Sequence, residues 1–492
     1  MKKIYIYTLA SLALWGAASC KKPNDFGTTN VDPKAVNIPI PAALLANAMN
    51  NLGAYVTTNA YSIGPGSYAQ YFSETQYPSV SLYNIPQQDF APVYNGSLYD
   101  LQNVINLNQS KNTVAAAKIL QSYYFWVLTD SFGDLPYSQA LQGIKAINPV
   151  YDKQEDIYKG LLNTLTAAIA SMDGGAVAGD LVYGGDAASW KRMANSLKLL
   201  IALQASKAPD NDFAKAAFVQ ASTDAAGLIT DNSQNFTFSY PGGTSNYNSP
   251  WYNLYNGRTD WAESKTMTDM TASLNDGRTV PFGGSFTDPN QVKGGTITSN
   301  VGVPNGYDRA KTIAFTGANP GWALVLRADY RTQASSVVVL SAAEVLLALT
   351  EGANIGWIPT TNMLSNYQKG IQQSFAQWGV ASPAASYYTN ASVAISVGGA
   401  GNAKNIAIQQ WIAAYPDGHY GWDIWRKTGY PVLTPAPEAT NSSKQIVRRF
   451  VYHTNEYTTN EANVRAAVAR EVGPNPGTDS QDNTVWWDPG KK

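Results

Sequence analysis

One short segment of the chain, residues 251–261, combines large aromatic side chains with charged groups. It holds five candidate ligand contacts: Trp251, Tyr255, Arg258, Asp260 and Trp261. The apolar C–H faces of a sugar ring stack on Trp and Tyr rings, while guanidinium and carboxylate groups hydrogen-bond to its hydroxyls. This combination predicts a site that binds carbohydrate.

Two other places carry candidate binding aromatics. Tyr77 and Tyr83 lie in an aromatic, irregular segment near the N-terminal end, and Trp322 is a further candidate. Large aromatic side chains are more often buried in a core than exposed to a ligand, so core packing is the competing interpretation for each. The cluster at 251–261 is therefore the main candidate, and Trp322 is the next.

Motifs of common catalytic sites are absent from the sequence. It has no Gly-rich phosphate loop ending in Lys-Ser/Thr, no G-x-S-x-G elbow, no H-E-x-x-H motif and no EF-hand loop. Its two histidines and single cysteine leave no site built from several thiolate or imidazole ligands. We predict a protein with no catalytic residue, no cofactor and no metal at its binding site, and leave a structural calcium ion open.

A glycoside hydrolase is the alternative from another functional class. Such an enzyme needs only two carboxylates that face each other across the glycosidic bond. Five acidic residues lie in or near aromatic loops: Glu74, Asp89, Asp260, Glu263 and Asp329. Because a chain with 35 acidic residues produces such coincidences, the enzyme remains the minority interpretation.

The composition limits the class of ligand. The 492-residue chain has a formal net charge of −1 and 14% charged residues, against about 25% in an average globular protein. It contains 30 Tyr and 13 Trp. A nucleic-acid partner would require a basic stripe, which this chain lacks, whereas uncharged polar and aromatic residues favour neutral, hydroxyl-rich ligands.

The N-terminus has the pattern of a secretory signal peptide that ends at a cysteine. Lys2 and Lys3 precede an apolar run at 4–14, and small residues at 17–19 precede Cys20. We predict a lipoprotein signal peptide over 1–19, lipidation of Cys20 and a polar tether over 20–41. Two or more acyl chains would anchor the protein stably in a membrane. Ordinary secretion with an unpaired cysteine is the alternative.

Apolar residues at helical spacing predict a mainly α fold with little β structure. Helix starts are expected at the cap residue Asp186 and at two capping boxes, 152–155 and 341–344. We interpret 42–492 as a single domain, with helices mainly over 42–230 and 340–380. Helical periodicity is lost over 231–335, which we expect to be the loop-rich ligand region.

A second aromatic stretch, residues 411–431, is expected to have a structural role. We call this stretch, WIAAYPDGHYGWDIWRKTGYP, the signature segment. Its Pro-Asp-Gly turn predicts a helix that ends near Tyr415 and another that begins near Tyr420. Arg426 is expected to stack on Trp422 or Trp425 as a structural lock. His419 is expected to be a solvated turn residue.

The signature segment resembles the C-terminal motif of the SusD/RagB family of outer-membrane lipoproteins, with Lys427 in place of a second arginine. Other blocks that resemble the family lie at 25–36, 70–84, 123–138, 180–207 and 446–460. In the signature segment the matching residues are Trp422, Trp425, Arg426, Thr428, Gly429, Tyr430 and Pro431.

The resemblance implies a fold and a role. The expected fold is an α–α superhelix of tetratricopeptide-like hairpins merged with a loop-rich half. The expected role is capture of oligosaccharide at the cell surface, on the outer membrane, and delivery to a SusC-like TonB-dependent transporter. A peptide ligand, as in RagB-like members, is the alternative within the family. No ligand contact is carried to this chain by the resemblance.

Overall fold

The computed structural model describes residues 39–84, 87–243, 247–255, 257–284 and 297–490. The predicted signal peptide, the lipidation site Cys20 and nearly all of the tether lie outside the described residues. The described residues from Pro41 onward form one compact unit.

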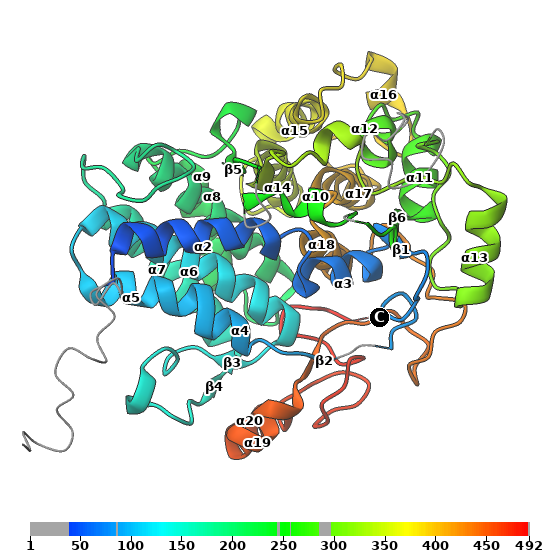
Figure 1. Ribbon diagram of the computed structural model, residues 1–492. Coiled ribbons are helices and arrows are strands. Elements are labelled where there is room, and N and C mark those ends of the chain that lie inside the picture. The colour runs from blue at the N-terminus through cyan, green and yellow to red at the C-terminus, as the bar shows by residue number, and fades with distance from the viewer. Residues whose placement is uncertain (1–38, 85–86, 244–246, 256, 285–296, 491–492) are drawn as a thin grey trace, which may run out of the picture. The chain divides into compact units, whose positions relative to one another are not determined.

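The protein is mainly helical, and helices that follow one another in the chain pack against one another as tetratricopeptide-like hairpins. Packing of apolar faces, rather than intrinsic propensity, supplies most of the stability of such helices. In Figure 1 the first series lies together, and a second series packs on it through α8 and α14. The first series is α2 (Pro41–Tyr55), α5 (Tyr99–Leu107), α6 (Lys111–Phe132), α7 (Gln154–Ser171), α8 (Ala187–Gln204) and α9 (Asp212–Thr223). The second is α14 (Ala342–Asn354), α15 (Met363–Gln377), α17 (Asn402–Ala414) and α18 (Gly418–Thr428).

Two of the three predicted helix caps are confirmed. Asp186 accepts hydrogen bonds from the first turn of α8, and Ser341 and Glu344 form the predicted capping box of α14. The box at 152–155 was wrong: α7 begins after Lys153, and Asp152 instead accepts hydrogen bonds from the backbone of Tyr137 and Ser138. The Asp152 carboxylate therefore binds backbone groups elsewhere in the chain and does not cap the helix, contrary to the prediction from the local pattern.

The β structure consists of small two-stranded sheets. Each joins segments that are separated in the chain and so fixes loops to the helical body. The pairs are β1 (Phe72–Glu74) with β6 (Trp261–Glu263), β2 (Gln87–Gln88) with β8 (Val451–Tyr452), β3 (Leu135–Pro136) with β4 (Tyr151–Asp152), and β5 (Phe236–Phe238) with β7 (Val337–Leu340).

Shorter helices fill the remaining segments, including the region 231–335. In Figure 1, α11 and α13 lie near the β1–β6 pair, and α19 and α20 lie together away from it. These helices are α3 (Ala60–Tyr68), α4 (Ala91–Val93), α10 (Pro250–Asn253), α11 (Lys265–Ser273), α12 (Thr279–Gly283), α13 (Arg309–Ala318), α16 (Ala385–Thr389), α19 (Thr454–Thr459) and α20 (Glu461–Val468). Within the described residues, no helix is both long and apolar enough to cross a lipid bilayer.

The two helices of the signature segment pack against each other, with α17 also against α14 and α18 also against α3. The predicted break between two helices is confirmed, since α17 ends at Ala414 and α18 begins at Gly418. Arg426 stacks on Trp422 at 3.5 Å from the ring centroid, as predicted, and also on Trp487. His419 was predicted wrongly: it is 4% exposed, because α18 turns it into the interior beside Asp423.

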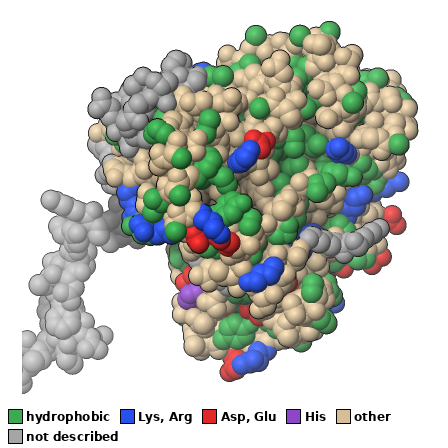
Figure 2. Space-filling model, turned by 90° about the vertical axis from the view of Figure 1, so that its right-hand side faces the viewer, with side chains coloured by type: hydrophobic (Ala, Val, Ile, Leu, Met, Phe, Trp, Pro, Cys, Tyr) green, Lys and Arg blue, Asp and Glu red, His purple; other side chains and the backbone are tan. Residues whose placement is uncertain are grey.

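Charged side chains are sparse on the face that carries α11 and α13. Figure 2 shows them scattered among uncharged polar and hydrophobic side chains. This face is therefore suited to a ligand that brings hydroxyl groups and apolar surface rather than a high charge.

Candidate functional site

The β1–β6 pair joins two segments that are far apart in the chain. Phe72 lies opposite Glu263, and Glu74 lies opposite Trp261. The antiparallel pairing continues beyond the strands, where the Thr75 N–H donates to the Asp260 carbonyl at 2.8 Å. The residues just after β1 therefore emerge beside those just before β6.

This arrangement places Tyr77 beside Arg258 and Asp260. The Tyr77 side chain is 61% exposed. Two guanidinium groups lie over its ring, that of Arg258 at 5.7 Å and that of Arg309, at the start of α13, at 5.4 Å from the centroid. Arg258 also pairs with Asp260 at 2.5 Å. Trp261, the next residue after Asp260, is half-buried at the start of β6. We call Tyr77, Arg258, Asp260, Trp261 and Arg309 the Tyr77 cluster.

The Tyr77 cluster offers the groups that a sugar ring requires. Tyr77 supplies an aromatic ring that remains largely open to solvent, and the cation–π contacts hold the guanidinium groups beside it. An exposed ion pair contributes only about 0–1 kcal/mol, so the pair of Arg258 and Asp260 is readily exchanged for hydrogen bonds to ligand hydroxyls.

A buried carboxylate shapes the loop that carries Tyr77. Glu74 is 8% exposed, and its Oε2 accepts hydrogen bonds from the N–H groups of Ser79 and Ser81 at 2.8 and 2.9 Å and from the Ser81 hydroxyl. Burial raises the pKa of Glu74, and these hydrogen bonds oppose part of that rise. The loop after β1 is thus held by hydrogen bonds to the Glu74 side chain.

Replacement of Glu74 by alanine should loosen this loop. The change leaves two backbone N–H groups without their acceptor, which costs about 1–3 kcal/mol. We expect lower thermal stability and faster amide hydrogen exchange over residues 75–84. Glu74→Gln, which keeps an acceptor oxygen, should retain most of the protection. Glu155→Ala, which removes a carboxylate paired with Lys159 on α7, should leave the exchange at 75–84 unchanged. Unaltered exchange at 75–84 in Glu74→Ala would contradict this role.

Four of the predicted contact residues are packed inside the protein. Tyr83, Trp251, Tyr255 and Trp322 are 2%, 4%, 2% and 5% exposed, respectively. The Tyr255 hydroxyl donates to the Trp261 carbonyl at 2.8 Å and accepts from the Val325 N–H, and the Tyr83 hydroxyl accepts from the Ala436 N–H. As ligand contacts, these four rings would have to be open to a ligand. The structure instead packs them in the core, because residues from distant parts of the chain cover the rings. Trp251 nevertheless lines a cavity.

Arg309 was missed by the sequence analysis. It lies far along the chain from Tyr77 and reaches it because Asn305 donates hydrogen bonds to the carbonyls of Ser67 and Phe72, which ties the segment before α13 to β1. No local pattern in the sequence predicts the contact between Arg309 and Tyr77.

Of the five carboxylates considered for hydrolysis, one, Asp260, belongs to the Tyr77 cluster, where it pairs with Arg258. Glu263 is fully buried, and burial raises its pKa well above the ordinary value. Glu74 holds a loop, and Asp329 pairs with Arg327 at 2.6 Å. Among the described residues, no three His, Cys, Asp or Glu side chains form a group that could hold a metal ion.

Comparisons with known proteins agree with this fold. Residues 33–453 match the SusD-like family model described as "Starch-binding associating with outer membrane". A search of curated proteins found no match. Among solved structures, a chitin-binding SusD homolog from Flavobacterium johnsoniae shares 23% identity and a TM-score of 0.76, over 91% of this chain and 98% of its own. A SusD homolog from Bacteroides uniformis shares 25% identity and a TM-score of 0.73, over 90% of this chain and 99% of its own.

A structure described as a chitin-binding protein is similar over 91% of this chain and all of its own, with 24% identity and a TM-score of 0.76. These likenesses extend over the helical body and the loop-rich region alike. Since the family match itself spans most of the sequence, the chain belongs to the SusD-like family.

Proposed function

We propose that this protein captures oligosaccharide at the Tyr77 cluster and passes it to a SusC-like TonB-dependent transporter of the outer membrane. The observation that carries the proposal is the exposed Tyr77 ring between two guanidinium groups, with a carboxylate beside them. Lipidation of Cys20 would hold the protein on the membrane, facing the cell surface.

SusD-like proteins are binding proteins and not enzymes. The family description names starch, and two structurally similar proteins are described as chitin-binding. Both polymers are rich in hydroxyl groups and present sugar rings for stacking. These descriptions support a glycan ligand for this chain, and the low charge of the sequence supports a neutral one.

Replacement of Tyr77 by alanine should weaken glycan binding about 2- to 13-fold. An aromatic contact of this kind contributes about 0.5–1.5 kcal/mol, which converts to that ratio of dissociation constants. Calorimetric titration with starch and chitin oligosaccharides and a tryptic peptide pool would measure it. Tyr99→Ala is the matched control, since Tyr99 is 47% exposed on α5, outside the cluster. Equal loss in both variants, or binding of peptide alone, would overturn the proposed site or its ligand.

Delivery requires a separate test. The protein is co-expressed with a SusC-like transporter of the same cell and purified through a tag on the transporter. Co-purification supports delivery. Glycan binding without co-purification would leave the capture step standing and contradict the transfer step.

A further inference from the structure

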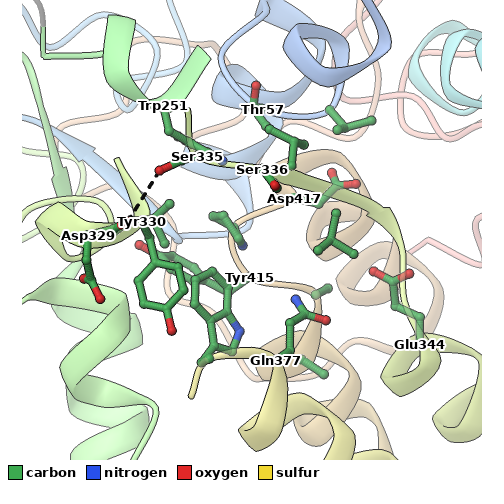
Figure 3. Close-up of a pocket in the computed structure, with 18 residues that line it drawn as sticks. Thr57, Trp251, Asp329, Tyr330, Ser335, Ser336, Glu344, Gln377, Tyr415 and Asp417 are labelled. Atoms are coloured by element: carbon green, nitrogen blue, oxygen red, sulfur yellow. Dashed lines mark hydrogen bonds between the residues drawn. The ribbon is translucent and has the colours of Figure 1, made fainter. Parts of the chain in front are cut away.

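A cavity of about 310 Å³ lies beside the junction of α17 and α18. Its walls come from segments that are far apart in the chain: the end of α2, α10, the segment 326–338, the start of α14 and the end of α15. Figure 3 shows the side chains that line it, with Glu344 and Asp417 on one side and Trp251 and Tyr330 on another. This volume is at the lower end of the range for small-molecule sites.

Two carboxyl groups in the wall are not matched by a basic side chain. Glu344 caps α14 by accepting from the Ser341 N–H at 2.9 Å, and Asp417 caps α18 by accepting from the Tyr420 N–H at 3.1 Å. Among the described residues that line the cavity there is no Lys, Arg or His. The third carboxylate, Asp329, already pairs with Arg327.

The helix N-termini compensate only part of this charge. Each contributes roughly +0.5 of an elementary charge to the group that caps it. When both carboxyl groups are ionised, about −1 therefore remains at the cavity wall. A single monovalent cation would balance this residual charge.

The rest of the wall suits the body of an organic ligand. Trp251, Tyr330, Trp378 and Tyr415 line the cavity with aromatic surface, and Tyr330 and Trp378 pack edge to face at 5.0 Å. Trp378 is 6% exposed, and its Nε1 has no hydrogen-bond partner in the described structure. The Oε1 of Gln377, which Figure 3 shows beside the same space, is likewise buried without a partner. Aromatic faces attract cations as well as apolar surface.

We infer that this cavity binds a small organic cation, with its ammonium group near Glu344 and Asp417 and its apolar body against Trp251 and Trp378. When these two carboxyl groups are ionised, they repel an anion. A neutral molecule of the same shape would fill the cavity and leave their repulsion in place. The site is separate from the Tyr77 cluster and adds a second ligand to the proposed glycan capture.

The two carboxyl groups should make this binding depend on pH. Burial raises the pKa of Glu344 to about 8, with the Asp417 charge adding to the rise, and burial raises the pKa of Asp417 to about 7. A cation binds the ionised forms and lowers both pKa values, so binding should tighten from about pH 6 to about pH 9 and release protons.

Other titratable groups around the pair do not account for such a change. Burial raises the pKa of the facing phenols above their ordinary value of 10, so they stay neutral over this range. Burial lowers the pKa of His419 below 6.5, away from the values of about 7 and about 8 at which Asp417 and Glu344 titrate. The groups that interact electrostatically with the pair are Tyr71, Tyr123, Tyr420 and Asp423. His419 lines a small pocket with both carboxyl groups, and Asp329, Tyr330 and Tyr415 share the cavity wall.

A matched pair of probes tests the inference: cyclohexylamine, which is a cation at these pH values, and cyclohexanol, its neutral counterpart. Calorimetry on the full chain should detect cyclohexylammonium binding that strengthens at least about 10-fold from about pH 6 to about pH 9. Near neutral pH, titration in two buffers of different ionisation enthalpy should report proton release. Cyclohexanol should bind at least about 10-fold more weakly at the higher pH.

The double variant Glu344→Gln/Asp417→Asn keeps an oxygen at each helix cap and removes both charges. It should lose the preference for the amine and the pH dependence, while glycan binding at the Tyr77 cluster is unchanged. If it fails to fold, the proton release of the unaltered protein decides alone. Equal binding of the two probes, no binding of the amine, or amine binding without proton release would overturn the inference.

Discussion

Replacement of Arg426 by methionine should lower the free energy of unfolding by about 3–5 kcal/mol, the range found when one partner of a buried ion pair is removed. The Arg426 side chain is fully buried, and its guanidinium donates to the Asp130 and Arg448 carbonyls at 2.8 Å each and to the Asp423 carboxylate. It also stacks on Trp422 and Trp487. The substitution leaves Asp423 buried without its cation, and denaturant titration would measure the loss.

Two variants separate the charge from the packing. Arg426→Met with Asp423→Asn removes both charges and should recover part of the stability, because no uncompensated carboxylate remains. Arg465→Ala removes an exposed arginine from the surface pair with Glu461 and should change stability by at most about 1 kcal/mol. If Arg426→Met cost no more than Arg465→Ala, the signature segment would not depend on this lock.

Replacement of Gly418 by alanine should destabilise the protein at the upper end of the about 1–3 kcal/mol that overpacking costs. A Cβ at this position would lie 2.1 Å from the Ser62 carbonyl oxygen and 2.5 Å from the Gly66 Cα. Both are backbone atoms of α3, so α3 and α18 would have to separate. The midpoints of thermal and denaturant unfolding would report the change.

Gly317→Ala provides a control with the opposite sign. Gly317 lies within α13, and nothing is within 4 Å of the position of a Cβ there. Alanine loses less conformational entropy than glycine when a helix forms, so this variant should gain about 0.5–1 kcal/mol. A Gly418→Ala protein as stable as Gly317→Ala would show that α3 and α18 are not held at this distance.

The helices could be predicted from the sequence because their signals are local. Asp186 and the Ser341–Glu344 box act within one turn of the chain, so their spacing alone identifies the starts of α8 and α14. The prediction of a capping box at 152–155 was wrong because Asp152 accepts hydrogen bonds at Ser138, a contact that a local pattern does not contain.

The sequence suggested eight ligand contacts, and their role in binding stays a prediction. The structure places three of them, Tyr77, Arg258 and Asp260, together at the surface. The sequence did not distinguish Tyr77, which is 61% exposed, from Trp322, which is 5% exposed. Both residues are large aromatics in irregular segments, so the sequence gives them the same interpretation. Their exposure depends on which distant segments pack over each ring.

The sequence by itself determined the mainly helical class, the scarcity of charge and the resemblance to SusD-like proteins, since these follow from composition, spacing and motif order. Only the tertiary structure decided that Arg309 joins Tyr77, that His419 is buried, and that Glu344 and Asp417 share a cavity wall. Each of these depends on contacts between residues far apart in the chain. Such contacts are fixed by the packing of whole elements, and that packing leaves no periodic trace in the sequence.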